Sequence, residues 1–280
     1  MKLVSRRLSL AAAALLFAGF GSLASAADIM VPMEGKSALV DQIKANGELR
    51  VGVAIAPPWL GQDPNNSEYF GAAFEIGQRA AMELGVDITP ISSGWDVIIA
   101  GIQGNQFEIA IAPLFATEKR RKVVDFVNWT EAGTCYIVLK DSPIMTFEDM
   151  NQPGVRIGTY TGTGTEHGIV AKYTEATIDS IVQQVSGAHR IEDVLTKRID
   201  VAPIDDALAF VMEAEYPEIR IIPESAEHCI NNSDIPFPIG MAFNYGDPEF
   251  KAFLESIVAA MQDEIAASLI KYSDPRYIKQ

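Results

Sequence analysis

The chain has 280 residues, a formal net charge of −15 and three histidines. A surface this acidic repels nucleic acid and anionic lipid, so neither is expected as a partner. The histidines show no metal-ligand spacing, and no nucleophile elbow or P-loop is present, so neither a metal nor a cofactor is expected.

The first 26 residues have the pattern of an export signal. Lys2, Arg6 and Arg7 precede a short apolar run over residues 8–20, and the small residues Ala24-Ser25-Ala26 form a cleavage site. The run is shorter than the ~20 apolar residues of a membrane anchor. Because the segment carries three positive charges and no acid, its removal takes the net charge from −15 to −18. We expect a protein of the bacterial periplasm, exported by the general or the twin-arginine route.

From residue 49 onward, short β-rich runs alternate with amphipathic helical stretches, which is typical of an α/β fold. The elements expected in the first half are strands over 49–54, 86–89 and 108–112 and helices over 71–84 and 95–102. The strand over 108–112 is almost continuously apolar, as expected for a parallel strand covered on both faces.

The pattern then restarts. The elements expected in the second half are strands over 154–159, 180–185 and 200–204 and helices over 164–173, 188–197 and 206–214. Two such halves indicate two lobes rather than one long sheet. Apolar runs over 135–139 and 238–243 are candidate crossing strands, and Asp247-Pro248 opens a final helix that reaches residue 270.

Cys135 and Cys229 are the two cysteines of the chain. An oxidising compartment would allow a disulfide between them. Their separation in sequence does not decide the matter, because the bond needs Cα atoms within about 7 Å of each other. A disulfide and two free thiols are both open at this point.

The segment Gly162-Thr-Gly-Thr-Glu-His-Gly168 follows a predicted strand and opens a helix. A helix N-terminus presents free N–H groups, so Thr163, Gly164 and Thr165 are candidates to hold an anion. Simple capping of the helix by the threonines is the competing interpretation. A dinucleotide fingerprint is disfavoured because the glycine spacing is one residue too long.

Charged residues follow two other predicted strands. The run Thr117–Lys122 is typical of a solvated turn, from which one arginine could turn inward to grip a carboxylate with its planar fork. Asp205 and Asp206 directly follow a strand, at the end that faces the ligand crevice in open α/β sheets. Helix N-capping by Asp205 is the alternative.

Aromatic residues gather near the ends of the first-half strands, and most such residues belong to a core. Trp59 differs, because it follows Pro57-Pro58 in a loop and its burial would suit covering a ligand. The aromatic residues in this group are Trp59, Tyr69, Phe70, Trp95 and Phe115.

Taken in order, several segments resemble the polar amino-acid family of periplasmic solute-binding proteins. They are residues 49–53, 95–102, 116–126, 157–166, 198–205 and 246–251. The resemblance implies an α/β, type II periplasmic binding protein fold, in which two lobes joined by two hinge-crossing strands close on a ligand. The first lobe would comprise residues 27–136 and 240–280, and the second lobe residues 137–239.

In that family the arginine of a Thr-x-x-Arg segment binds the α-carboxylate of the ligand and a second-lobe aspartate binds its α-ammonium. The resemblance therefore implies these roles for Arg120 and Asp205. The ligand-binding residues implied or suggested in this way are Arg120, Asp205, Thr163, Gly164, Thr165, Trp59, Trp95, Pro113 and Phe115. Family members often have serines where this chain has Ala112, Pro113 and Phe115, so a ligand with an apolar or aromatic portion is expected.

The function implied is the periplasmic binding component of an ABC importer. It would act as a monomer and not as an enzyme, bind an amino acid or a derivative, and deliver it to the cognate membrane permease. Two alternatives are kept. One is an enzyme similar to cyclohexadienyl dehydratase, whose catalytic glutamate would fall at Glu166, and the other is a sensory or accessory binding protein.

Overall fold

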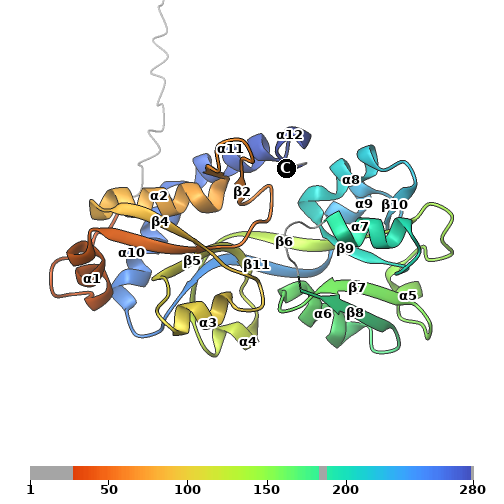
Figure 1. Ribbon diagram of the computed structural model, residues 1–280, viewed down its shortest axis with the longest axis horizontal. Coiled ribbons are helices and arrows are strands. Elements are labelled where there is room, and N and C mark those ends of the chain that lie inside the picture. Colours follow the sequence, from red (N-terminus) through yellow and green to blue (C-terminus); the bar gives the residue numbers. More distant parts are fainter. Residues whose placement is uncertain (1–27, 183–187, 279–280) are drawn as a thin grey trace, which may run out of the picture.

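The computed structural model describes residues 28–182 and 188–278, so the predicted export segment lies outside the described residues. Two lobes lie side by side along the long axis of the molecule (Figure 1). Two long strands, β6 (Asp125–Leu139) and β11 (Asp234–Phe243), run antiparallel to each other and pass from one lobe to the other. No helix in the described ranges combines the length and apolar character needed to cross a membrane.

The first lobe is built on a mainly parallel sheet. Its central strand β1 (Glu48–Val53) pairs in parallel with β4 (Asp87–Ser92) and with β5 (Ile109–Phe115). β11 lies antiparallel on the other side of β5. The carboxyl ends of β1 and β5 therefore point toward the second lobe, where open α/β sheets place their ligands.

Helices cover both faces of this sheet, which explains the apolar sequence of β5. Ile109 and Ile111 belong to one apolar cluster and Ala110 and Ala112 to another, because side chains alternate between the two faces of a strand. The covering helices are α2 (Ala72–Leu84), α10 (Pro248–Ala260) and α11 (Gln262–Tyr272) on one face, and α3 (Ile98–Gln103) and α4 (Glu118–Arg121) on the other (Figure 1).

Short elements complete the first lobe. They are α1 (Ala38–Asn46), β2 (Gly61–Gln62), β3 (Tyr69–Phe70) and α12 (Pro275–Ile278). The limits of α1 are local: Ser37 accepts a hydrogen bond from the Val40 N–H at its start, and Gly47 ends it in a left-handed conformation.

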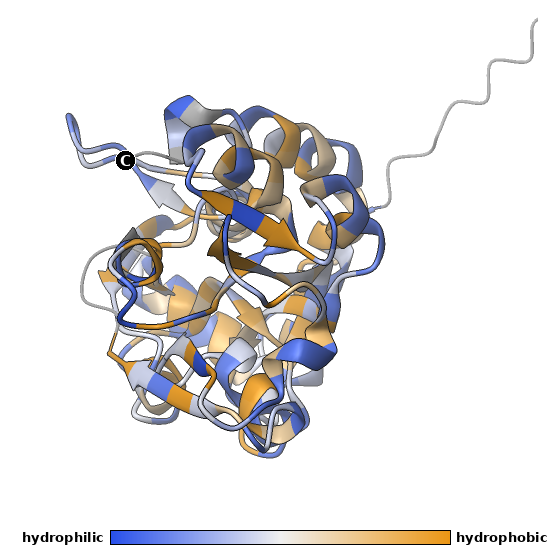
Figure 2. Cartoon of the chain, turned by 90° about the vertical axis from the view of Figure 1, so that its right-hand side faces the viewer, coloured by the Kyte–Doolittle hydropathy of each residue, from blue (hydrophilic) through white to orange (hydrophobic). Residues whose placement is uncertain are grey.

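The second lobe is built around the far half of β6. That half pairs antiparallel with β9 (Ala202–Asp205) and with β10 (Ile219–Ile222). A separate parallel pair consists of β7 (Arg156–Tyr160) and β8 (Thr177–Ile181). The remaining elements of this lobe are α5 (Phe147–Met150), α6 (Gly164–Lys172), α7 (Ala188–Leu195), the 3₁₀ helix η1 (Asp206–Leu208), α8 (Ala209–Glu215) and α9 (Ala226–Asn231). Figure 2 views this lobe from its outer end, with hydrophilic segments on its surface helices and loops.

Most predicted elements are confirmed with shifts of a few residues, but several details were wrong. The helix predicted over 206–214 is the 3₁₀ helix η1 followed by α8. Separate sheets were expected in the two lobes, but strand pairing is continuous from β4 to β10. The reason is that β6 is long enough to pair in both lobes. The last predicted helix is two helices, α10 and α11, which meet at Met261. The strand predicted over 180–185 is β8, which ends at Ile181, and residues 183–187 lie outside the described residues.

The passage between the lobes is visible in the apolar clusters. On β6, Ala132 packs in the cluster of the first lobe, whereas Cys135 packs in a cluster of the second lobe. The boundaries given for the lobes in the sequence remain a prediction.

Candidate functional site

Arg120 is the arginine of the charged run that turns inward. Thr117 caps the short helix α4 by accepting a hydrogen bond from the Arg120 N–H, which fixes the backbone directly after β5. The guanidinium then spans the gap between the lobes. Its Nη1 donates to the Phe115 carbonyl at 2.9 Å and its Nη2 donates to the Gly162 carbonyl at 2.9 Å. Its neighbour Arg121 instead donates to the Ala116 carbonyl and to the Asn128 side chain.

The charge of Arg120 has no carboxylate partner within the described part of the chain. The residue is only 5% exposed, and no Asp or Glu among the described residues forms an ion pair with it. Burial lowers the pKa of Arg120 to about 10, so the guanidinium is still protonated at neutral pH. The two carbonyls use two of its five N–H groups, which leaves donors for an anion.

The turn at Gly162 brings the second lobe against the first. Gly162 has a φ of +82°, and a Cβ placed there would lie 2.7 Å from the Asp96 Cα. A Cβ placed at Gly164 would lie 2.5 Å from the Phe115 Cβ. Glycine at both positions therefore allows the close approach of the two lobes around Arg120.

Thr163 acts as the N-cap of α6. Its hydroxyl accepts a hydrogen bond from the Glu166 N–H at 3.1 Å and donates its one hydrogen to the Tyr160 carbonyl at 2.8 Å. The capping interpretation therefore holds for this side chain. The N–H groups of Gly164 and Thr165 occupy the first turn of α6, where no acceptor exists within the helix. Backbone groups, rather than the Thr163 hydroxyl, are thus the donors that an anion would meet.

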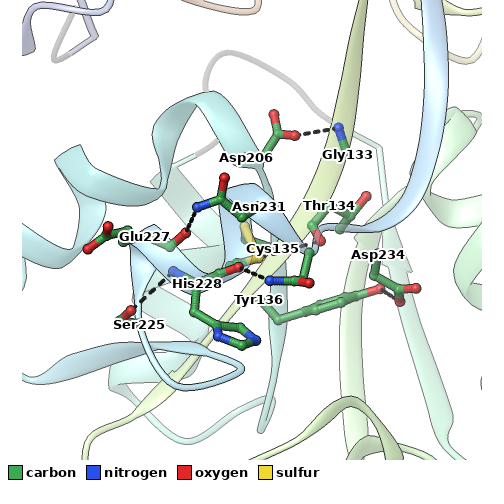
Figure 3. Close-up of a disulfide and its surroundings, with 12 residues drawn as sticks. Gly133, Thr134, Cys135, Tyr136, Asp206, Ser225, Glu227, His228, Asn231 and Asp234 are labelled. Atoms are coloured by element: carbon green, nitrogen blue, oxygen red, sulfur yellow. Dashed lines mark hydrogen bonds between the residues drawn. A yellow bond between two sulfur atoms is a disulfide. The ribbon is translucent and has the colours of Figure 1, made fainter.

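Asp205 and Asp206 have different surroundings although they are adjacent in sequence. The Asp206 carboxylate accepts a hydrogen bond from the Gly133 N–H on β6 at 2.7 Å (Figure 3). Asp205 is the N-cap residue of η1, but its side chain makes no capping bond. No hydrogen bond or ion pair to the Asp205 carboxylate is found within residues 28–182 and 188–278. Desolvation by partial burial and the charge of Asp206 raise the pKa of Asp205 to about 7.

The aromatic residues divide between the core and the contact between the lobes. Phe115 packs against Phe237 of β11 with ring centroids 5.3 Å apart and the rings tilted by 35°. Phe237 was missed in the sequence because it precedes the apolar run taken as the crossing strand. The Trp95 carbonyl lies beside Gly162. Trp59 is 3% exposed within the core cluster of the first lobe, and Pro113 is buried in β5. The roles of Trp59, Trp95 and Pro113 toward a ligand remain predictions.

A second polar contact between the lobes was also missed. Lys119 of α4 and His167 of α6 approach to 3.3 Å between Nζ and Nε2. Burial and the positive charges of Lys119 and Arg120 lower the pKa of His167, while Glu166 raises it. A neutral imidazole that accepts from the lysine is consistent with this geometry.

Two further features surround the site. Cys135 and Cys229 form a disulfide within the second lobe, with Cα atoms 5.9 Å apart, which resolves the alternatives left open by the sequence (Figure 3). No group of three or more His, Cys, Asp or Glu side chains in the described ranges is arranged to hold a metal ion.

Comparisons with known proteins agree with this architecture. The family profile of bacterial extracellular solute-binding proteins, family 3, matches residues 49–273. The glutamine-binding protein of a Bacillus subtilis ABC transporter is 25% identical over 255 residues, which cover 87% of this chain and 83% of that protein. The L-cystine-binding protein of Escherichia coli is 25% identical over 151 residues, 53% of this chain, and the match spans only 56% of that relative.

Among solved structures, an ancestral amino-acid-binding protein, described as a precursor of cyclohexadienyl dehydratase, superposes with a TM-score of 0.71 at 27% sequence identity. The superposition covers 84% of this chain and 99% of that chain. Both the family profile and the two-lobed architecture span most of the described residues. The chain therefore belongs to the bacterial extracellular solute-binding proteins, family 3.

Proposed function

We propose that the protein binds the zwitterion of an amino acid, or of a close derivative, between its two lobes. It then delivers this ligand from the periplasm to the membrane permease of an ABC importer. The observation that carries the proposal is the buried guanidinium of Arg120, which has no carboxylate partner within the described chain. An unpaired buried charge is costly, so a ligand carboxylate would supply the missing counter-charge.

The carboxylate of the ligand would be held from both lobes. Arg120 offers the planar fork that matches a carboxylate bidentately, and it already donates to the Gly162 carbonyl of the second lobe. The N–H groups of Gly164 and Thr165, which have no acceptor within α6, would add backbone donors and the positive end of the helix dipole. A carboxylate at this position would therefore favour closure of the lobes.

The ammonium group of the ligand would bind Asp205. This carboxylate has no partner within the described residues, and its raised pKa indicates that its charge is poorly stabilised by the residues around it. A cation beside Asp205 would stabilise the ionised form. The names of the glutamine-binding, cystine-binding and ancestral amino-acid-binding relatives support a ligand that carries both charges.

The side chain of the ligand would meet an apolar environment. Phe115 and Phe237 pack against each other with tilted rings, and β5 contributes Ala112 and Pro113 shortly before Phe115. None of these side chains offers a hydrogen bond. An amino acid with an apolar or aromatic portion fits these surroundings better than an acidic one.

The geometry of Glu166 disfavours the alternative enzyme function. One carboxylate oxygen accepts the Gly162 N–H at 2.7 Å, and the other oxygen accepts the Ser180 hydroxyl. Glu166 therefore closes the turn before α6, and a general acid or base would first have to leave these partners. We propose a binding role for the turn and no catalytic one.

Isothermal titration of the ligand-free protein with a panel of single amino acids and cystine tests the proposal. Micromolar affinity needs about 8 kcal/mol, and each charge-assisted hydrogen bond contributes about 1.5–3 kcal/mol, so about three to five such bonds, shared between the two charged anchors, would supply it. We expect Arg120→Ala to weaken binding more than tenfold. The matched control Arg121→Ala, one residue along the same helix, should leave the affinity unchanged.

Two results would contradict the proposal, one concerning the ligand carboxylate and the other the ligand side chain. Equal affinity of a folded Arg120→Ala variant and the wild type would remove the carboxylate assignment. Tight binding of glutamate or aspartate alone would show that the expectation of an apolar ligand side chain is wrong, while the zwitterion site itself would stand.

A further inference from the structure

One buried carboxylate ties the far end of α6 to both crossing strands. Asp234, the first residue of β11, is 6% exposed and accepts hydrogen bonds from the hydroxyls of Tyr136 on β6 and Tyr173 next to α6 (Figure 3 shows Asp234 and Tyr136). Lys172, the last residue of α6, forms an ion pair with the same carboxylate. Burial raises the pKa of both tyrosines, and the charge of Asp234 adds to this, so the two hydroxyls keep their protons and donate.

The next residue, Ile235, has a backbone conformation that its side chain disfavours. Its φ is +45°, in the left-handed region that β-branched residues very rarely adopt. The α6 backbone is pressed against it, since a Cβ placed at Gly168 would lie 2.4 Å from the Ile235 Cγ2. Such a conformation persists only where the surrounding contacts enforce it. Here these contacts come from Asp234 and from α6.

The other end of α6 follows the turn over residues 162–164, which is called the ligand turn from here on. This helix has nine residues, and its first residue, Gly164, lies against Phe115, while Gly162 accepts a hydrogen bond from Arg120. A short helix moves as a rigid unit, so a change at Lys172 and Tyr173 is transmitted to Gly164.

We propose that Asp234 is a positioning residue that holds the second lobe closed on the first. Through Lys172 and Tyr173 it fixes α6, keeps Ile235 in its strained conformation and places the ligand turn against Arg120. When the lobes open, Ile235 relaxes to an extended backbone and α6 withdraws from the first lobe. The inference rests on the proposed function, because closure is what retains the ligand, but closure itself can be measured without ligand.

The test measures the distance between the lobes in the ligand-free protein. Spin labels on Met82→Cys and Met145→Cys report on the two lobes, because both residues are exposed and the described chain has no free cysteine to compete for the label. Pulsed electron paramagnetic resonance then gives the populations of molecules with short and with long distances between the two labels. We expect Tyr173→Phe and Asp234→Asn each to raise the ratio of open to closed molecules about tenfold, the scale of losing a hydrogen bond to a charged group.

Two further variants separate positioning from a general loss of stability. Tyr272→Phe removes a tyrosine hydroxyl from the first lobe, where it bonds to Lys271, and should leave the distances unchanged. Ile235→Gly removes the strain, so adding it to Tyr173→Phe should return the distances toward those of the wild type. Tyr173→Phe keeps the buried ring, so it stays informative even if Asp234→Asn does not fold.

The inference is overturned if Tyr173→Phe has the distances of the wild type, or if Ile235→Gly fails to reverse its effect. These outcomes do not depend on the proposed function. A protein that binds no amino acid and still opens in the Tyr173→Phe variant would refute the ligand assignment alone.

Discussion

Arg120 and Asp205 illustrate how burial decides the properties of single residues. Arg120 remains charged although burial lowers its pKa to about 10, whereas burial and a like charge raise the pKa of Asp205 to about 7. The first residue is thus a permanent cation and the second a carboxylate that titrates near neutral pH. Binding of a zwitterion should therefore depend on pH through Asp205.

We expect the affinity for the ligand to fall as the pH drops through about 7. An ammonium group binds the ionised Asp205, so binding is full above that pH and weakens about tenfold per pH unit below it. Titration calorimetry between pH 6 and 8 would measure this, a range that lies mostly above the lowered pKa of His167. The Asp205→Asn variant should bind the ligand weakly and independently of pH. If the affinity of the wild type does not change over this pH range, the role of Asp205 is ruled out.

The same shift in pKa makes an opposite prediction for the stability of the protein measured without ligand. Because the folded state holds the Asp205 proton more tightly than the unfolded state, this residue lowers stability as the pH rises from about 4 to about 7. Asp205→Asn should therefore melt higher than the wild type at pH 8, by roughly 2–4 °C per 1 kcal/mol gained, and no higher at pH 4. Thermal unfolding without ligand measures the difference.

At the scale of elements, the turn that opens α6 makes the contact between the lobes. Gly162 and Gly154 both have positive φ values, of +82° and +92°. Their surroundings differ, because a Cβ at Gly162 would meet the backbone of Asp96 and a Cβ at Gly154 would meet nothing within 4 Å. Comparing an alanine substitution at each position therefore separates the cost of the left-handed backbone from the cost of holding the lobes apart.

We expect Gly162→Ala and Gly154→Ala to lose a similar stability of about 1 kcal/mol from the left-handed conformation. Gly162→Ala alone should also lose ligand affinity, by tenfold or more, because the added methyl group prevents the approach of the turn to the first lobe. Melting curves and calorimetry on both variants test this. Equal ligand affinity in the two variants would show that this contact is not needed for binding.

On the scale of the whole molecule, the disulfide between Cys135 and Cys229 joins a crossing strand to a helix of the second lobe. It closes a chain segment with a sequence separation of 94 residues. Chain-entropy arguments assign a loop of that length about 4–5 kcal/mol of stabilisation. The stability of the second lobe therefore depends on an oxidising environment that keeps this bond formed.

Removal of the disulfide should lower the melting temperature by about 8 °C or more. The double variant Cys135→Ala/Cys229→Ala shows this without reductant, and wild-type protein treated with dithiothreitol should match it. Because the variant has no bond to reduce, dithiothreitol should not change its melting further. If the variant has the same melting temperature as the oxidised wild type, the stabilisation assigned to the disulfide is wrong.

Much of the fold was predictable because it depends on residues close together in the chain. Short apolar runs located β1 and β5, and the start signal at Asp247-Pro248 placed the beginning of α10 correctly. The length of β6 was not predictable, because charged and polar residues interrupt its apolar pattern where it leaves the first lobe. Pairing with β11 in one lobe and with β9 and β10 in the other maintains the strand through these residues.

The candidate site divides in the same way. The sequence by itself determined the class of fold and offered the cap at Thr163 as one of two interpretations, since both depend on patterns among residues close together in the chain. Only the tertiary structure decided which of two adjacent aspartates is left without a partner. The register of β9 against β6 places Asp206 beside Gly133, and so leaves the carboxylate of Asp205 without a partner among the described residues. Contacts between elements distant in the chain carry no local signal, which is why the contacts of Phe237 and His167 and the disulfide were visible only in the folded protein.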